Sequence, residues 1–400
     1  MSAQKRSGLL RPLDFAAPYR QRTQHAHGLQ LLDWFWACII SGVASILRFL
    51  GIAVATSFAK VGEALQAWDG HVYLDIAATG YFSATAGGAA DPTTYEHRLA
   101  FFPGLPLSIR GISAITGWSL EASGLVLVHV CAIIAIAGII QLARLLGAST
   151  STSLMVAVVV ASAPMAITMS MVYTEAPFVM AMVWFLITLS QGKHLPATCW
   201  LVTAGFLRLT AIDLVLALVL AIVVLCPRDW RSWLVALIGS MPLVGYVLWA
   251  SYYTRDAGGY FGIQAQGWHS SFDFGQATFA WLLKTLREPV IFGYVLSSFA
   301  IILIVALMLI AWRGLPLLWW LSAAGITANV VLSDGIMHSR PRLLLPALVI
   351  FLIPLVLRCA ERWKTGRTWQ RWGIALVGVG WVALGLGSSI YMVTAFPYAI

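Results

Sequence analysis

The sequence predicts an all-α polytopic membrane protein, and three observations lead to this prediction. Hydrophobic residues make up 60% of the 400 residues and charged residues only 10%, whereas a soluble globular domain carries about 25% charged residues. The apolar residues form unbroken runs, such as LMVAVVVASAPMAI and IILIVALMLIAW. Because the strands of outer-membrane barrels alternate polar and apolar residues, these runs exclude a barrel. The composition also excludes a soluble enzyme, a disordered protein and a secreted disulfide scaffold.

The first 28 residues are polar and basic and contain no apolar core of a cleavable signal peptide. Their cations are Lys5, Arg6, Arg11, Arg20 and Arg22. We therefore expect residues 1–28 to form a cytoplasmic basic tail, and residues 29–400 to form a single transmembrane domain.

A membrane-spanning helix needs about 20 apolar residues, and nine stretches come close to this length. They are 31–58, 121–146, 151–169, 172–190, 232–252, 290–312, 315–333, 342–358 and 372–392.

The stretch 196–225 is too long for one comfortable span and is interrupted by GFLRLTAID, which carries Arg208 and Asp213. We interpret it as two shorter helices that meet at a polar turn. The whole chain then has about eleven membrane segments.

The charges of the loops predict the orientation in the membrane. With the N-terminus inside, every cytoplasmic loop carries Lys or Arg, as the positive-inside rule requires. These loops are QLARLLGAST, SQGKH, CPRDWRSW, AWRG and RCAERWKTGRTWQR, and we expect them to bind anionic membrane lipids. Two long loops, 60–120 and 253–289, then lie outside. We expect an integral, multi-pass plasma-membrane protein whose chemistry takes place at the extracytoplasmic face.

The first outer loop opens with WDGHVYLDIAATGYF, which places Asp69 directly after Trp68 and close to an apolar helix end. A carboxylate at the level of the lipid headgroups experiences a low dielectric, which favours a general base. His71 and Asp75 are spaced i,i+4 and predict a short surface helix. The alternative is an interfacial amphipathic helix with solvated charges.

The same loop continues to YEHRLAFFPGLPLSIRG, in which His97 and Arg98 precede two phenylalanines and two prolines. An arginine beside a histidine at the membrane face can bind a phosphate. Ordinary snorkelling of the arginine toward the headgroups is the alternative.

These two motifs together resemble the PIG-V family of membrane mannosyltransferases, which belong to the GT-C class of glycosyltransferases. Trp68 and Asp69 correspond to the family's Trp-Asp pair, and FFPGLP to its Phe-Phe-Pro-x-x-Pro motif. VYTEAPF looks like the family's Tyr-Ser/Thr-Glu corner, GFLRLTAIDLV like its helix break, YFGIQAQGW like a Gln-rich outer loop, and HSRPRLLLPA like its late Arg-x-x-x-Pro segment. The matches are spread in order over residues 68–346.

The resemblance implies a GT-C-type bundle with interfacial helices in the first outer loop. It also implies an inverting transferase that moves mannose from polyprenyl-phosphate mannose to a lipid-anchored or glycan acceptor. Asp69 would be the general base, with Glu175 or Asp75 as the alternatives. The residues expected to bind the donor phosphate are Arg208, Arg340, Arg342 and His338. The residues expected to bind the substrates are Trp68, His71, Tyr73, His97, Arg98, Tyr173, Glu175, Gln264, Gln266 and Trp268.

We expect no cofactor, no metal and no nucleic acid, because the chain has neither clustered metal ligands nor a Gly-rich phosphate loop. Polyprenyl-phosphate glucose or arabinose stays open as the donor. The main alternative function is a transporter or flippase for a lipid-linked or anionic substrate, with Arg208 and Asp213 as an ion pair at the membrane midplane. A scaffold without catalytic activity is the third interpretation.

Overall fold

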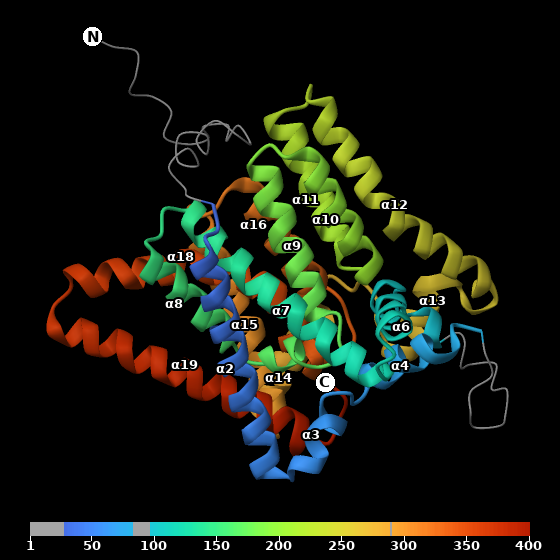
Figure 1. Cartoon of the computed structure of the whole chain (residues 1–400), viewed down its shortest axis with the longest axis horizontal. Coiled ribbons are helices and arrows are strands. Elements are labelled where there is room, and N and C mark those ends of the chain that lie inside the picture. The colour runs from blue at the N-terminus through green and yellow to red at the C-terminus, as the bar shows by residue number, and fades with distance from the viewer. Residues whose placement is uncertain (1–27, 83–96, 289) are drawn as a thin grey trace.

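The computed structural model describes residues 28–82, 97–288 and 290–400 (Figure 1). Its regular elements are all helices, apart from one isolated β-bridge between Phe272 and Ser333. The prediction of an all-α chain is therefore confirmed for the described residues.

Among these residues, five helices are long and apolar enough to cross a membrane. They are α2 (Leu31–Ala55), α7 (Leu120–Leu145), α12 (Trp230–Tyr253), α15 (Phe292–Ala311) and α19 (Thr368–Thr394). A sixth span is formed if the segment Met337–Leu343, which contains η3 (Met337–Ser339) and α17 (Arg340–Leu343), continues into α18 (Leu345–Thr365) across a bend of 54°.

Five further apolar helices are shorter. They are α8 (Thr150–Ala161), α9 (Glu175–Ser190), α10 (His194–Leu207), α11 (Ala211–Leu225) and α16 (Leu317–Val331). At 1.5 Å per residue, the 16 residues of α9 extend about 24 Å, less than the ~30 Å hydrocarbon core of a bilayer. Five or six helices of spanning length stand beside five shorter apolar helices, so the expected number of about eleven membrane segments stays a prediction.

The largest error in a predicted span concerns 151–169, because α8 already ends at Ala161. Pro164 follows, and the residue after it, Met165, has a positive φ of 62°. A proline disfavours helix in the residue before it and cannot donate to the helical ladder, so the chain turns here. It continues through the short 3₁₀ helix η1 (Ala166–Met169) to the start of α9.

The division of 196–225 into two helices is confirmed. Helix α10 ends at Leu207, α11 begins at Ala211, and Arg208 between them has an extended backbone with φ −167° and ψ 157°. Helix α9 is buried along nearly its whole length, since it packs between α7 and α10. This enclosure explains why α9 is apolar on every side.

The two long loops carry helices of their own. The first holds α3 (Phe58–Ala64), α4 (Asp69–Thr79) and α6 (Gly104–Thr116). The second holds η2 (Arg255–Ala257), α13 (Gly259–Trp268) and α14 (Gln276–Arg287). Helices α4 and α6 pack together, and α13 packs on α12 near them (Figure 1).

The predicted helix over HVYLDIAATGY exists as α4, but it is more than a solvated surface helix. Its residues Tyr73, Leu74, Ile76 and Ala77 are buried in the core, while Asp75 and His71 are exposed. Its last carbonyl groups accept hydrogen bonds from arginines. Arg110 donates to Ala77 and Ile76, and Arg98 donates to Gly80. Cations at a helix C-terminus complement its dipole, so α4 is held firmly in place.

Candidate active site

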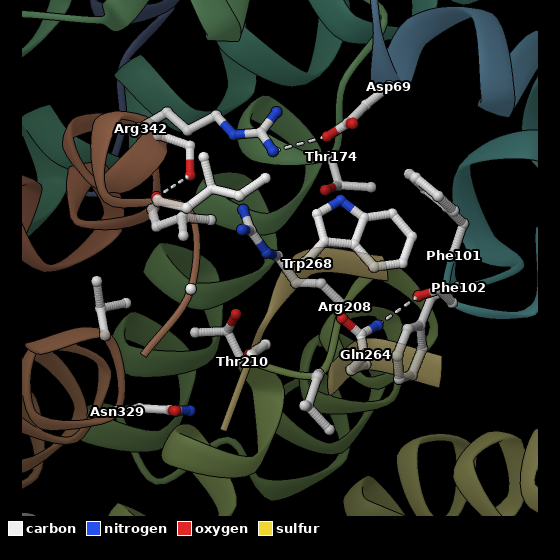
Figure 2. A pocket seen from close by; sticks show the side chains of 18 of the residues that line it. Asp69, Phe101, Phe102, Thr174, Arg208, Thr210, Gln264, Trp268, Asn329 and Arg342 are labelled. Carbon is white, nitrogen blue, oxygen red and sulfur yellow. Dashed lines mark hydrogen bonds and ion pairs between the residues drawn. The ribbon is translucent and has the colours of Figure 1, made fainter. Parts of the chain in front are cut away.

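A pocket of about 250 Å³ lies where the ends of several helices meet (Figure 2). Its walls come from the start of α4, the start of α9, the break between α10 and α11, the end of α13, and the segment from α16 to α17. Nine of the side chains that the sequence predicted for the site line this pocket. They are Asp69, Tyr73, Tyr173, Glu175, Arg208, Gln264, Trp268, Arg340 and Arg342.

Asp69, the predicted base, is the first residue of α4 and forms an ion pair with Arg342. Its Oδ2 lies 2.7 Å from Nη2 of Arg342. The other carboxylate oxygen, Oδ1, has no hydrogen-bond partner among the described residues. The preceding residue, Trp68, has a positive φ of 54°, which is unusual for a side chain of this size. The chain therefore enters α4 through a strained backbone directly beside the acid.

Glu175, the first residue of α9, is buried between two arginines. Its Oε1 lies 3.2 Å from Nη1 of Arg208 and 3.9 Å from Nε of Arg342. A carboxylate at this position also complements the positive end of the α9 dipole. Glu175 thus links the two cations, and together with Asp69 these residues form one alternating network of two acids and two arginines.

Two N–H groups of Arg342 are available to donate hydrogen bonds to a ligand. Its Nε and Nη1 are buried without a hydrogen-bond partner among the described residues, and its guanidinium lies 4.9 Å over the ring of Tyr173. A buried N–H group without a partner is costly, so these two groups are candidates to donate to a ligand oxygen.

Two buried tyrosines border the acids. Burial raises the pKa of Tyr73, and the charge of Asp69 adds to this effect. Burial raises the pKa of Tyr173 as well, again with a contribution from Asp69. Both phenols therefore stay protonated at neutral pH. Tyr173 donates its hydroxyl proton to the carbonyl of Ala67, just before α4.

Aromatic rings form the opposite wall. Trp268 packs edge-on against Phe101 at 5.7 Å between ring centroids and stacks on His97 at 4.8 Å. Burial lowers the pKa of His97, although the nearby Asp69 acts in the opposite direction. Gln264 donates to the carbonyl of Ala100 and to the hydroxyl of Tyr260, so its amide group is fixed.

Arg340 lines the pocket, but its guanidinium is occupied by the protein, which corrects its predicted role as a phosphate ligand. It donates to the carbonyls of Val330 and Ser333 and to the hydroxyl of Thr278. These bonds tie the loop after α16 to α14. We therefore regard Arg340 as a residue that shapes the pocket wall.

Five other predicted residues do not line the pocket, and His97 borders it through its ring contacts with Trp268 and Phe101. Trp68 packs behind Asp69 against a neighbouring apolar cluster. His71 is exposed on the outer side of α4. Arg98 holds the end of α4, and Gln266 donates to the carbonyl of Ala257. His338 bonds to the carbonyl of Ala399 and packs on Phe396.

Asp213 does not pair with Arg208, in contrast to the ion pair considered for a transporter. Its Oδ2 accepts a hydrogen bond of 3.2 Å from Nδ2 of Asn329. Asn329 lines the pocket and was not predicted from the sequence. A lone asparagine inside the apolar helix α16 was the signal for it, because a polar side chain in such a helix needs a partner. Thr174, Thr210 and Asp334 also line the pocket without having been predicted.

No protein-family model and no curated protein sequence matches this chain. The resemblance to the PIG-V family therefore stays a prediction. Among solved structures, the chain is similar to the protein O-mannosyltransferase complex Pmt1–Pmt2 of S. cerevisiae bound to the sugar donor. The TM-score is 0.37 and the sequence identity 12%, and the match covers 64% of this chain and 38% of that chain. This chain thus spans little more than a third of that protein, and at this distance the likeness assigns neither a fold nor an activity.

Proposed function

We propose that this protein is an inverting membrane glycosyltransferase that moves mannose from polyprenyl-phosphate mannose to a lipid-anchored or glycan acceptor. The observation that supports it best is the network of Asp69, Arg342, Glu175 and Arg208 in one pocket at the ends of apolar helices. It combines an acid that can take a proton with guanidinium groups that can bind a phosphate.

The guanidinium groups suit a lipid-phosphate leaving group. When the bond between the anomeric carbon and the phosphate oxygen breaks, negative charge develops on the phosphate, and fixed cations stabilise that charge. Arg342 has two buried N–H groups free for phosphate oxygens. Arg208 can contribute from the other side, since among the described residues its guanidinium bonds only to Glu175 and packs on the ring of Phe178.

Asp69 suits the role of base because Arg342 holds its Oδ2 in place, while its Oδ1 has no hydrogen-bond partner among the described residues. In the proposed step, the acceptor hydroxyl attacks the anomeric carbon and gives its proton to Asp69. The sugar–phosphate bond breaks, and polyprenyl phosphate leaves with the bonding electron pair. Donor phosphate bound at Arg342 would draw that cation away from Asp69.

The position of the pocket supports a substrate that lies in the membrane. Helices α9, α10, α11 and α16 have 14 to 16 residues and are about 21–24 Å long. Helices α2 and α7, with 25 and 26 residues, extend about 38 Å. The pocket thus lies at the ends of helices that are shorter than the ~30 Å hydrocarbon core of a bilayer, and this supports a donor whose headgroup is held at the membrane interface.

The experiment that tests this function measures transfer of labelled mannose from polyprenyl-phosphate mannose in membranes that contain the wild-type chain or Asp69→Asn. We expect the substitution to reduce the transfer rate by 10²–10⁴-fold, the usual contribution of a general base. Binding of the donor should be retained, because the two arginines are unchanged.

Asp75→Asn is the matched control, since Asp75 lies on the same helix with a side chain that is 64% exposed. It should leave transfer unchanged. Transfer that persists in Asp69→Asn would refute the assignment of the base. If the wild type transferred neither mannose nor polyprenyl-linked glucose or arabinose to any of several lipid acceptors, the proposed reaction would be wrong.

A further inference from the structure

A second cavity, of about 210 Å³, forms an apolar groove between α2, α8 and α19. Ile39, Val43 and Leu47 of α2 form one wall, and Val382 and Leu386 of α19 form the other. No residue of this groove lines the candidate active site. In Figure 1, these three helices lie on the side of the molecule away from α4, α6 and α13.

The groove has one charged residue, Arg48, which is 5% exposed. Its Nη2 donates to the carbonyl of Ala161, the last residue of α8. Among the described residues, Arg48 has no other hydrogen bond and no acidic partner. A guanidinium carries five N–H donors and a full charge, whereas the end of a helix offers only about half a negative charge. A buried cation is costly without an anion. The described residues of the groove supply no such counter-charge, so an anionic ligand would stabilise Arg48.

The direction of the groove matches that of a lipid in one leaflet. Arg48 lies seven residues before Ala55, the last residue of α2, and thus about 10 Å from the helix end. The apolar residues of the groove extend along α2 from Arg48 back to Ile39, a distance of about 13 Å that passes the middle of the helix. The same end of α2 leads through α3 to Asp69, so the cation lies toward the end of the bundle that holds the active site.

Close contacts fix α19 at the charged end of the groove. A Cβ atom at Gly385 would overlap the carbonyl oxygen of Ser162, just after α8, and a Cβ at Gly51 of α2 would overlap Ile390. The two glycines therefore allow α19 to cross α8 and α2 at short distance. The groove is a feature built between three crossing helices and not a gap left by a loose one.

We infer that this groove binds an anionic phospholipid, with its phosphate at Arg48 and an acyl chain along α2 toward the middle of the membrane. Val43 and Leu47 are 50% and 45% exposed, as expected for side chains that meet hydrocarbon. A zwitterionic lipid would bring its own cation close to Arg48 and fit less well. The site is separate from the proposed reaction and does not depend on it.

The test uses the purified full chain and two probes with identical acyl chains, phosphatidylglycerol and phosphatidylcholine. Bound lipid is counted by native mass spectrometry, and the dissociation constant is measured by titration. We expect the wild type to prefer phosphatidylglycerol by about tenfold. Arg48→Gln should remove this preference, because a charge-assisted hydrogen bond is lost.

Val382→Trp fills the groove and leaves Arg48 in place, so it should abolish binding of both lipids at this site. Its matched control is Val379→Trp, at a residue of α19 that is 68% exposed and does not line the groove. This variant should bind like the wild type. Equal affinity of the wild type for both lipids, or unchanged binding by Val382→Trp, would overturn the inference. The second variant decides the question even if Arg48→Gln does not fold.

Discussion

Two arginines that are two residues apart meet different surroundings at the candidate active site. The guanidinium of Arg340 donates hydrogen bonds to the carbonyls of Val330 and Ser333 and to the hydroxyl of Thr278. Arg342 pairs with Asp69, and two of its buried N–H groups have no partner among the residues that the structure describes. The first stabilises the pocket wall, and the second is available to a ligand.

Substitution by lysine should separate these two roles, because lysine keeps the charge and loses the planar fork. Arg340→Lys should lower the free energy of unfolding by about 1–3 kcal/mol, since buried carbonyls lose their donors. Arg342→Lys should keep most of the stability but lower transfer at least tenfold, with a higher KM for the donor. Thermal unfolding and donor titrations measure both effects. The same loss of stability in both variants would contradict the distinction.

His97 should make the stability of the folded protein depend on pH. Burial lowers its pKa below the usual ~6.5 of histidine, so the imidazole that stacks on Trp268 is neutral at pH 7. A group whose pKa is lowered on folding contributes its full stabilisation above the unfolded pKa and loses it as the pH falls through the folded pKa.

We therefore expect the wild type to lose thermal stability between pH 7.5 and pH 5.5, and His97→Phe to lose less over the same interval. Phenylalanine keeps an aromatic ring against Trp268 but takes up no proton. His71→Gln is the control, because His71 is an exposed histidine of the same long loop and does not line the pocket. A pH dependence unchanged by His97→Phe would rule out this role of His97.

At the scale of the elements, glycines decide how closely the helices approach. In α19, Gly385 faces the carbonyl of Ser162 so closely that a methyl group has no room, whereas nothing lies within 4 Å of a Cβ at Gly387. Both glycines are interior residues of the same helix. Their difference comes from the neighbouring helix alone.

Alanine at these two positions should have opposite effects. Gly387→Ala should stabilise the protein by up to about 1 kcal/mol, the usual difference in helix propensity. Gly385→Ala gains the same propensity but must push α19 away from α8, so it should destabilise the protein. Thermal unfolding of the two variants in the same detergent gives the comparison. A stabilised Gly385→Ala would show that the two helices do not cross this closely.

At the scale of the whole molecule, three apolar helices that begin at or near the pocket, α9, α11 and α18, lead to basic residues at their other ends. Helix α9 runs from Glu175 to a turn with Lys193, and α11 runs from the pocket to Arg228. Helix α18 leads from Arg342 to the cluster at Arg362, Lys364 and Arg367. For these three helices, the basic residues thus lie at the end away from the pocket.

This polarity predicts the topology in the membrane. Basic loops favour the cytoplasm, so a cysteine at His269 should react with a membrane-impermeant maleimide in intact cells. A cysteine at Lys193 should react only after the membrane is permeabilised. Labelling is compared with a background variant in which the exposed Cys38 and Cys199 are replaced by serine. The reverse labelling pattern would place the pocket at the cytoplasmic face and contradict binding of the donor at the extracytoplasmic face.

The sequence by itself determined the helical, membrane type of the chain, because these properties depend on local composition and run length. It also predicted the break at Arg208, since a charge inside an apolar stretch is costly. The number of membrane segments stays a prediction, and the segment expected at 151–169 is shorter than expected because Pro164 and the positive φ of Met165 follow the end of α8.

Several charged residues of the candidate site could be predicted from the sequence, because a charge beside an apolar stretch is unusual. Asp69, Glu175, Arg208 and Arg342 stand out as charges beside apolar helix ends, and that signal is present in the linear sequence. Only the tertiary structure decided which charges pair with one another, because pairing joins residues that are far apart along the chain. It showed that Arg340 donates to Val330 and Ser333 and that Asp213 accepts from Asn329. It also placed Arg48 in a groove where no described residue supplies a counter-charge.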